Sequence, residues 1–182
     1  FCNPTPLAAN GGPEAPCETI EPPAPPRVVI NEFMASNSSA SGIADEFGDY
    51  DDWIELYNIE AFDVDLSGMH LSDNLNNPTK WRFPEGASIP PQGYLIIWAD
   101  STPAQGPLHT SWALSANGEA IGLFDTVENN LRPIDTHTFG PQLVNVSEGR
   151  LPNGAGPFQQ LSEPTPGESN DPPASGWVAI TH

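Results

Sequence analysis

The sequence of 182 residues predicts an all-β protein, an antiparallel sandwich or barrel. Apolar runs of five to eight residues recur about every ten residues, with turn residues between them. No stretch has the apolar spacing of an amphipathic helix. Twenty-two prolines and sixteen glycines disfavour long helices and favour short strands joined by turns.

The first two expected strands flank an acidic connection. Residues 27–35 (RVVINEFMA) form a β-branched, extended run that follows a cluster of prolines. Residues 52–58 (DWIELYN) alternate with period two, so Ile54 and Leu56 share an aliphatic face. The opposite face of this strand is aromatic and partly polar.

The middle of the chain predicts three more strands. Residues 64–73 are interrupted at Gly68, where we expect a β-bulge. Residues 80–84 are short, with Trp81 and Phe83 on one side. Residues 93–100 (GYLIIWAD) are apolar on both faces, which predicts a central strand.

The last expected strands begin with a hairpin. Residues 108–115 and 119–125 flank Asn117-Gly118, a strong tight-turn signal. Further strands are expected in three more segments, the last of them at a sheet edge: 133–140, 147–154 and 156–161.

Six segments carry a resemblance to a known family. In chain order they are VVINEFMASN, DWIELYN, VDLSGMHLSDNLNNPTKWRFPEG, LHTSWALSANGEAIGLFD, FGPQLVNVSEGRLPNG and PTPGESN. Together they resemble the lamin tail domain, in the form found in bacterial secreted proteins, over residues 28–170. The resemblance implies an immunoglobulin-like β-sandwich without known catalytic residues, so we expect no enzyme. The chain has no coiled-coil rod, basic run or prenylation motif, so the nuclear role of the animal proteins does not carry over.

The expected organisation is one sandwich with Pro-rich N- and C-terminal extensions. Residues 1–26 are a Pro-rich segment, residues 27–170 the sandwich, and residues 171–182 a linker with an extra strand. That strand contains Trp177, Val178 and Ile180. An exposed apolar strand must pair somewhere. Its own sheet edge, a domain missing from this chain and a neighbouring subunit are the three possibilities.

The charge balance excludes several partners. Five basic residues face 24 acidic ones, a net charge of −19. Such a surface repels nucleic acid and anionic membranes. No apolar stretch is long enough to insert into a membrane, and we expect that a chain starting at Phe1 has already been processed.

Both cysteines, Cys2 and Cys17, lie in the first segment and predict a disulfide. Closing a loop of about 15 residues stabilises a fold by roughly 3 kcal/mol. The disulfide implies an oxidising compartment, and therefore an extracellular or cell-envelope location. The alternative is a lipoprotein attachment at Cys2, for which Phe1 is a poor preceding residue.

The acidic connection offers a calcium site. Asp45, Glu46, Asp49 and Asp51 supply the oxygen ligands that Ca²⁺ needs, and Gly48 allows a sharp turn. The spacing does not match the twelve-residue calcium loop. A solvated acidic turn in an acidic protein is the alternative, and it needs no metal. We expect no other cofactor.

Other polar residues favour structural roles. Glu32 and Glu55, on neighbouring strands, raise the possibility of paired glycosidase acids, but strand carboxylates are usually paired with arginine or solvated. Asp135 and His137 share a strand face, but no third metal ligand is evident.

The function expected from these observations is a non-catalytic, extracellular structural or adhesive module. It would assemble with itself into a fibre or surface layer through its terminal segments, or bind another extracellular protein. The alternative is a calcium-dependent ligand- or partner-binding module.

Overall fold

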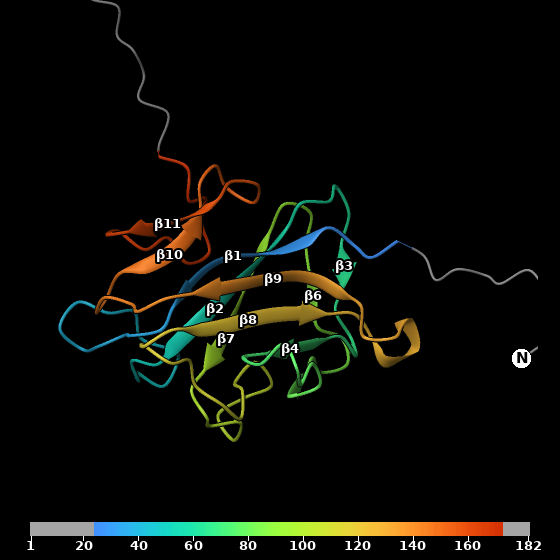
Figure 1. Ribbon diagram of the computed structural model, residues 1–182, viewed down its shortest axis with the longest axis horizontal. Coiled ribbons are helices and arrows are strands. Elements are labelled where there is room, and N and C mark those ends of the chain that lie inside the picture. Colours follow the sequence, from blue (N-terminus) through green and yellow to red (C-terminus); the bar gives the residue numbers. More distant parts are fainter. Residues whose placement is uncertain (1–23, 173–182) are drawn as a thin grey trace, which may run out of the picture.

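The computed structural model describes residues 24–172, which form two facing antiparallel sheets and a two-stranded ribbon (Figure 1). The sheets have the strand orders β11-β10-β1-β2-β7 and β5-β4-β8-β9, and β3 pairs with β6. The described residues contain one helical element, the 3₁₀ turn η1 (Val127–Asn129), so the prediction of an all-β fold is confirmed. The strands are β1 (Val28–Met34), β2 (Asp52–Asn58), β3 (Val64–Asp65), β4 (His70–Ser72), β5 (Trp81–Arg82), β6 (Ser88–Ile89), β7 (Tyr94–Ala99), β8 (Glu119–Phe124), β9 (Pro133–Phe139), β10 (Ser147–Arg150) and β11 (Phe158–Leu161).

The main core lies between the two sheets. Ile54 and Leu56 of β2 are fully buried in it, as the period-two alternation predicts. The ring of Phe33 from β1 lies 4.5 Å from that of Phe139 in β9, which joins the two layers. Burying one such side chain contributes about 1.5–3 kcal/mol. Two sheets packed face to face across this apolar layer define a β-sandwich.

The five-stranded sheet is also buried on part of its outer face. Because side chains alternate along a strand, Trp53 points away from the main core. It packs with Met34 and Trp98 in a second, smaller apolar cluster, to which Ile43 from the connection between β1 and β2 contributes. That connection, which carries the acidic residues, is therefore anchored to the sheet.

A β-bulge lies in β1 and not, as expected, at Gly68. The pairing of β1 with β2 shifts between Ile30 and Glu32, which makes Asn31 the extra residue. Bulges redirect side chains, and this one leaves Asn31 fully buried. Gly68, with φ of 78°, instead turns the chain from β3 into β4, which belongs to another sheet.

Strand β7 is at the end of its sheet, so the prediction of a central strand is wrong. Its edge is covered by a loop: Trp98 N–H donates to Leu108 O at 2.9 Å, and Thr110 N–H donates to Trp98 O at 2.8 Å. Both faces of β7 are apolar because one faces the main core and the other the second cluster.

The expected hairpin at Asn117-Gly118 is also not formed. Residues 108–115 make only isolated bridges, and β8 pairs with β4 and β9 instead. Trp112 and Leu114 are buried in the main core without belonging to a strand, which explains the misleading apolar pattern.

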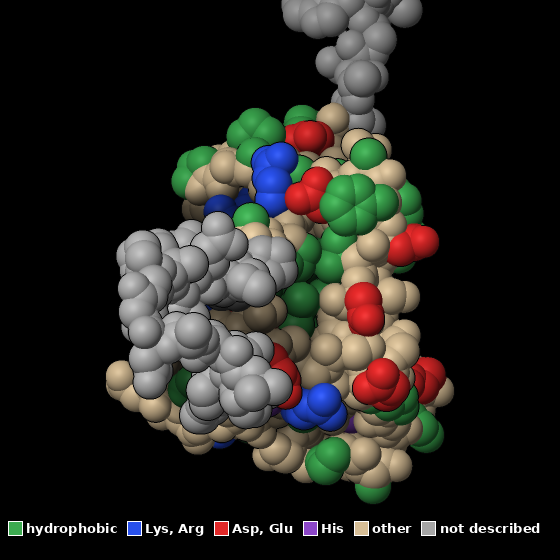
Figure 2. All heavy atoms as spheres, turned by 90° about the vertical axis from the view of Figure 1, so that its right-hand side faces the viewer, with side chains coloured by type: hydrophobic (Ala, Val, Ile, Leu, Met, Phe, Trp, Pro, Cys, Tyr) green, Lys and Arg blue, Asp and Glu red, His purple; other side chains and the backbone are tan. Residues whose placement is uncertain are grey.

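The face shown in Figure 2 carries more acidic than basic side chains, in line with the net charge of −19. Anionic partners such as nucleic acid are repelled by such a surface. Within residues 24–172, no helix has the length and hydrophobicity needed to cross a membrane.

Candidate metal centre

The acidic connection closes into a tight turn at Asp45. One carboxylate oxygen of Asp45, Oδ1, accepts hydrogen bonds from the backbone N–H groups of Phe47 and Asp49, each at 2.8 Å. The backbone N–H of Asp45 donates to Asp49 O at 2.9 Å, and Gly48 adopts φ of 86°. An aspartate that bonds to its own backbone two residues on is a common turn former. The turn therefore places Asp45 and Asp49 side by side.

Three of the four predicted metal ligands meet at this turn. Asp45, Asp49 and Asp51 each offer a carboxylate oxygen, and these oxygens lie within 4.8 Å of one another. Asp45 is only 9% exposed, and its Oδ2 is buried without a hydrogen-bond partner. A buried, unpaired carboxylate oxygen is costly. The cluster thus contains an acceptor that the described residues do not satisfy.

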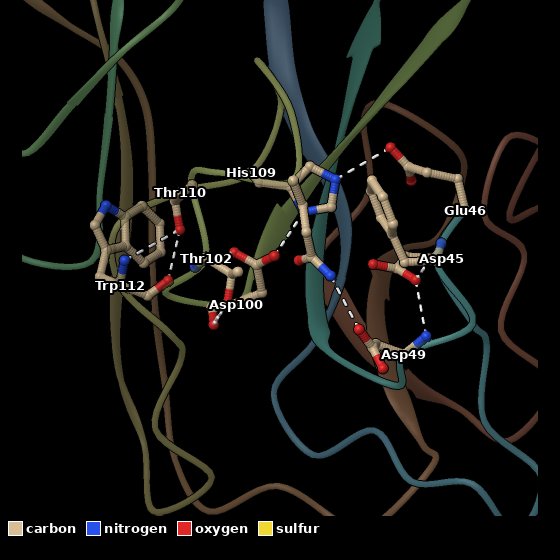
Figure 3. Close-up of polar contacts among 10 residues, drawn as sticks. Asp45, Glu46, Asp49, Asp100, Thr102, His109, Thr110 and Trp112 are labelled. Atoms are coloured by element: carbon tan, nitrogen blue, oxygen red, sulfur yellow. Dashed lines mark hydrogen bonds and ion pairs between the residues drawn. The ribbon is translucent and has the colours of Figure 1, made fainter.

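Gln105, whose amide touches the acidic turn, carries a second unpaired oxygen. Its Nε2 donates to Asp49 Oδ2 at 2.9 Å, so its amide lies against the acidic turn. Its Oε1 is buried and has no partner. Figure 3 shows Asp45 and Asp49 facing the loop that follows β7, from which Asp100 projects. Sequence reasoning missed Gln105 because it lies far along the chain from the acidic residues.

The fourth predicted ligand, Glu46, is engaged elsewhere. His109 Nε2 lies 3.1 Å from Glu46 Oε1, and His109 Nδ1 lies 2.5 Å from Asp100 Oδ2 (Figure 3). Burial lowers the pKa of His109, but the two carboxylates outweigh burial, so the pKa is raised overall. A charged imidazole donates from both nitrogens. Glu46 therefore belongs to the His109 group. Asp45 lies within 4.8 Å of both Glu46 and His109 as well as of Asp49 and Asp51, so it is shared by the two groups.

The aspartate cluster lacks a permanent counter-charge. Among the described residues, no lysine or arginine forms an ion pair with Asp45, Asp49 or Asp51. Burial raises the pKa of Asp51, and the negative charges of Asp100, Asp45 and Asp49 raise it further. The positive charge of His109 opposes these effects on Asp51 but does not cancel them.

Glu32 and Glu55 form a second acidic group on the outer face of β1 and β2. They are cross-strand partners, and both are fully buried. The expectation that they are solvated or paired with arginine is wrong, because the described part of the chain covers them with hydrogen-bond donors. Glu32 accepts from Ser147 Oγ at 2.5 Å and from Thr165 Oγ1 at 2.8 Å.

Glu55 is held in the same way by residues from distant segments. It accepts from Asn31 Nδ2 at 2.9 Å and from Gly167 N–H at 2.5 Å. Burial raises its pKa to about 7, with a smaller contribution from Glu32. Asn170 completes the network by donating to Asn31 O at 3.1 Å. Residues 165–170, which we call the closing segment, are thus bound to β1 and β2 through these two carboxylates.

The remaining candidates have structural partners or lie outside the described residues. Arg150 holds Asp135 with two hydrogen bonds of 2.9 and 3.0 Å, and the ring of His137 stacks on Phe158 at 3.7 Å. Asp135 and His137 therefore do not form a metal site. The predicted disulfide and terminal strand fall on residues that the structure does not describe: Cys2, Cys17, Trp177, Val178 and Ile180.

Comparison with known proteins identifies a family and one shorter similarity. The Lamin Tail Domain family model matches residues 21–141. A stretch of 73 residues is 33% identical to the granulocyte colony-stimulating factor receptor of Mus musculus. This stretch is 40% of the chain and only 8% of the receptor's length. The receptor's activity as a whole therefore does not transfer by this similarity.

Proposed function

Because this chain belongs to the lamin tail domain family, an immunoglobulin-like and non-catalytic family, we propose that it is a structural or adhesive interaction module of a secreted or envelope protein. The receptor similarity supports contact with other proteins and an extracellular setting. The high acidic excess suits a secreted module. The proposal extends to self-assembly through the terminal segments.

The observation that carries self-assembly is the free edge of β11. This strand ends the five-stranded sheet, and no described strand pairs with its outer side. A hollow of about 630 Å³ lies next to it, lined by Leu151, Leu161 and Pro172 among others. The last described residue, Pro172, lines this hollow and so lies beside an unpaired strand.

The occupant that we propose for this edge is the segment Trp177–Ile180 of a neighbouring copy. Its continuous apolar run, which contains Trp, Val and Ile, suits a strand, and an exposed sheet edge accepts an extra strand through backbone hydrogen bonds. A contact in which the tail of one copy pairs with β11 of the next copy, without the reverse contact between the same two copies, is heterologous. Such contacts build fibres or layers when they do not close into a ring.

Deletion of residues 173–182 tests this assembly while keeping Asp171, which accepts a hydrogen bond from Asn153 N–H at 3.0 Å. We expect light scattering to show large particles for the full chain and monomers for the deletion. The double substitution W177S/I180S should act like the deletion, and S175A should not. Unchanged particle size after the deletion, or a monomeric full chain, would contradict the proposal.

The aspartate cluster favours a second candidate, a module whose binding depends on calcium. Its unpaired oxygens would be satisfied by a cation. Electron microscopy of negatively stained samples, with calcium and with a chelator, distinguishes the two candidates. Assemblies that persist in chelator support the purely structural module, and assemblies that dissolve support calcium dependence.

A further inference from the structure

We propose that Asp45, Asp49 and Asp51, together with the side-chain oxygen of Gln105, bind one calcium ion. The inference sharpens the second candidate function, and it can hold whether or not the protein assembles. It changes the ligand set expected from the sequence, because Gln105 replaces Glu46. Each step below rests on contacts of the described residues.

The spacing of the oxygens fits a calcium ion. Calcium binds oxygens at roughly 2.3–2.6 Å, so two ligands on opposite sides of the ion lie about 4.6–5.2 Å apart. The oxygens of Asp45, Asp49 and Asp51 lie within 4.8 Å of one another. The three carboxylates are therefore close enough for one ion to contact all of them after small movements of their side chains.

Two buried oxygens without partners are the independent observation that points to a ligand. Asp45 is about nine-tenths buried, and its Oδ1 already accepts two backbone hydrogen bonds while its Oδ2 accepts none. The Oε1 of Gln105 is likewise buried without a donor. A cation would satisfy the Oδ2 of Asp45 directly. It would satisfy the Oε1 of Gln105 once the amide turns over, because the Nε2 of that amide now donates to Asp49.

The chemistry of the donors favours calcium over zinc or another transition metal. All proposed ligands are oxygens on connections between strands, which calcium prefers, while zinc prefers nitrogen and sulfur. The neighbouring imidazole of His109 is occupied on both nitrogens by Asp100 and Glu46. A zinc ion would have to break at least one of these bonds. Calcium also takes six to eight ligands, so water can complete its shell beside the exposed Asp49.

Bound calcium would link the turn to the rest of the sandwich. The turn belongs to the connection that packs Ile43 on Trp53, and Gln105 belongs to the loop after β7. The ion would hold these two loops together. Phe47 and Tyr50 on the same turn are 56% and 39% exposed, and a fixed turn would present them to a protein partner.

Isothermal titration calorimetry of the full chain, in buffer freed of divalent ions, tests the site. We expect one calcium per chain, with a dissociation constant on the order of 10⁻⁴ M, typical of extracellular modules. The variant D45N keeps one oxygen for the turn bonds to Phe47 and Asp49 but loses the free carboxylate oxygen. It should weaken binding at least tenfold, and D49N should do the same.

The matched control is D63N, which removes the same charge at an exposed site away from the cluster. Its calcium affinity should stay within about twofold of the wild type. Affinity at a specific site depends on the residues that contact the ion, and Asp63 is not one of them. Circular dichroism spectra that match the wild type would show that D45N and D49N are folded. Absence of saturable binding by the wild type, or equal losses in D63N and D45N, would overturn the site. Equal affinity for magnesium or tighter binding of zinc would overturn its assignment to calcium.

Discussion

Two acidic groups lie near β1 and β2, and they differ in their supply of hydrogen-bond donors. Glu32 and Glu55 accept hydrogen bonds from hydroxyl, amide and backbone N–H groups of three separate segments: β1, β10 and the closing segment. The aspartate cluster receives donors from its own turn and from Gln105, and the Oδ2 of Asp45 receives none. Burial alone therefore does not tell a structural carboxylate from a ligand. The two are distinguished by whether each buried carboxylate oxygen has a hydrogen-bond donor.

The largest expected effect is on the free energy of unfolding, and it comes from removing a hydrogen-bond donor of the buried pair Glu32 and Glu55. The substitution N31A deletes the amide that donates to Glu55 and accepts from Gly154 N–H. Leaving buried polar groups without partners should destabilise the fold by about 3 kcal/mol. Urea unfolding measures the loss, and N76A, at an exposed turn, is the control. A loss below about 1 kcal/mol would mean that water replaces the amide.

A somewhat smaller effect should follow from separating the closing segment from the sheet. A methyl group at Gly149 would lie 2.6 Å from Asn170 Nδ2 and 2.7 Å from Leu161, so G149A must displace one of them. We expect a loss of about 2 kcal/mol in unfolding free energy. G140A is the matched control, because a methyl group there meets nothing within 4 Å. Equal stability of the two variants would show that the closing segment adapts freely.

The pH dependence of stability provides a third test. The pKa of Glu55 rises from about 4.5 in the unfolded chain to about 7 in the fold. Between these values the folded state binds more protons, so the contribution of Glu55 falls as pH rises from 4.5 to 7. Relative to wild type, E55Q should gain at least about 1 kcal/mol between pH 5 and pH 8.

Urea unfolding at the two pH values measures this change, with E85Q at an exposed turn as the control. Comparison with the control removes the contribution of the other carboxyl groups. A parallel pH dependence in wild type and E55Q would place the proton on another group, and would make Glu55 an ordinary ionised carboxylate.

The smallest expected effect is on calcium affinity, and it comes from Gln105 at the edge of the aspartate cluster. The substitution Q105L removes the neutral amide oxygen but keeps the three carboxylates, so calcium affinity should fall only a few-fold. Calorimetry against D45N gives the comparison. A loss as large as that of D45N would make Gln105 a ligand equal to the carboxylates, and no loss would remove it from the ligand set.

The sequence predicted the strands that alternate and have apolar faces, such as β2, because alternation is a local property. It failed at residues 108–115, where Trp112 and Leu114 fill the core from an irregular segment. It predicted a calcium-binding turn from acidic residues that lie close together in the chain. It could not reveal Gln105, or the donors of Glu55, because these come from distant segments that only the folded chain brings together.

The closing segment also decides how the domain would respond to tension. Asn170 and Thr165 bind Asn31 and Glu32, so the last described residues are tied to the first strand. A pull on the two ends is therefore transmitted across these bonds, from one terminal element straight to the other. Gly167 adds a bond to Glu55 of β2, whereas strands β3 to β9 lie outside that path. In a fibre, the mechanical strength of each domain would be set at this junction, while the core of the sandwich remained unstretched.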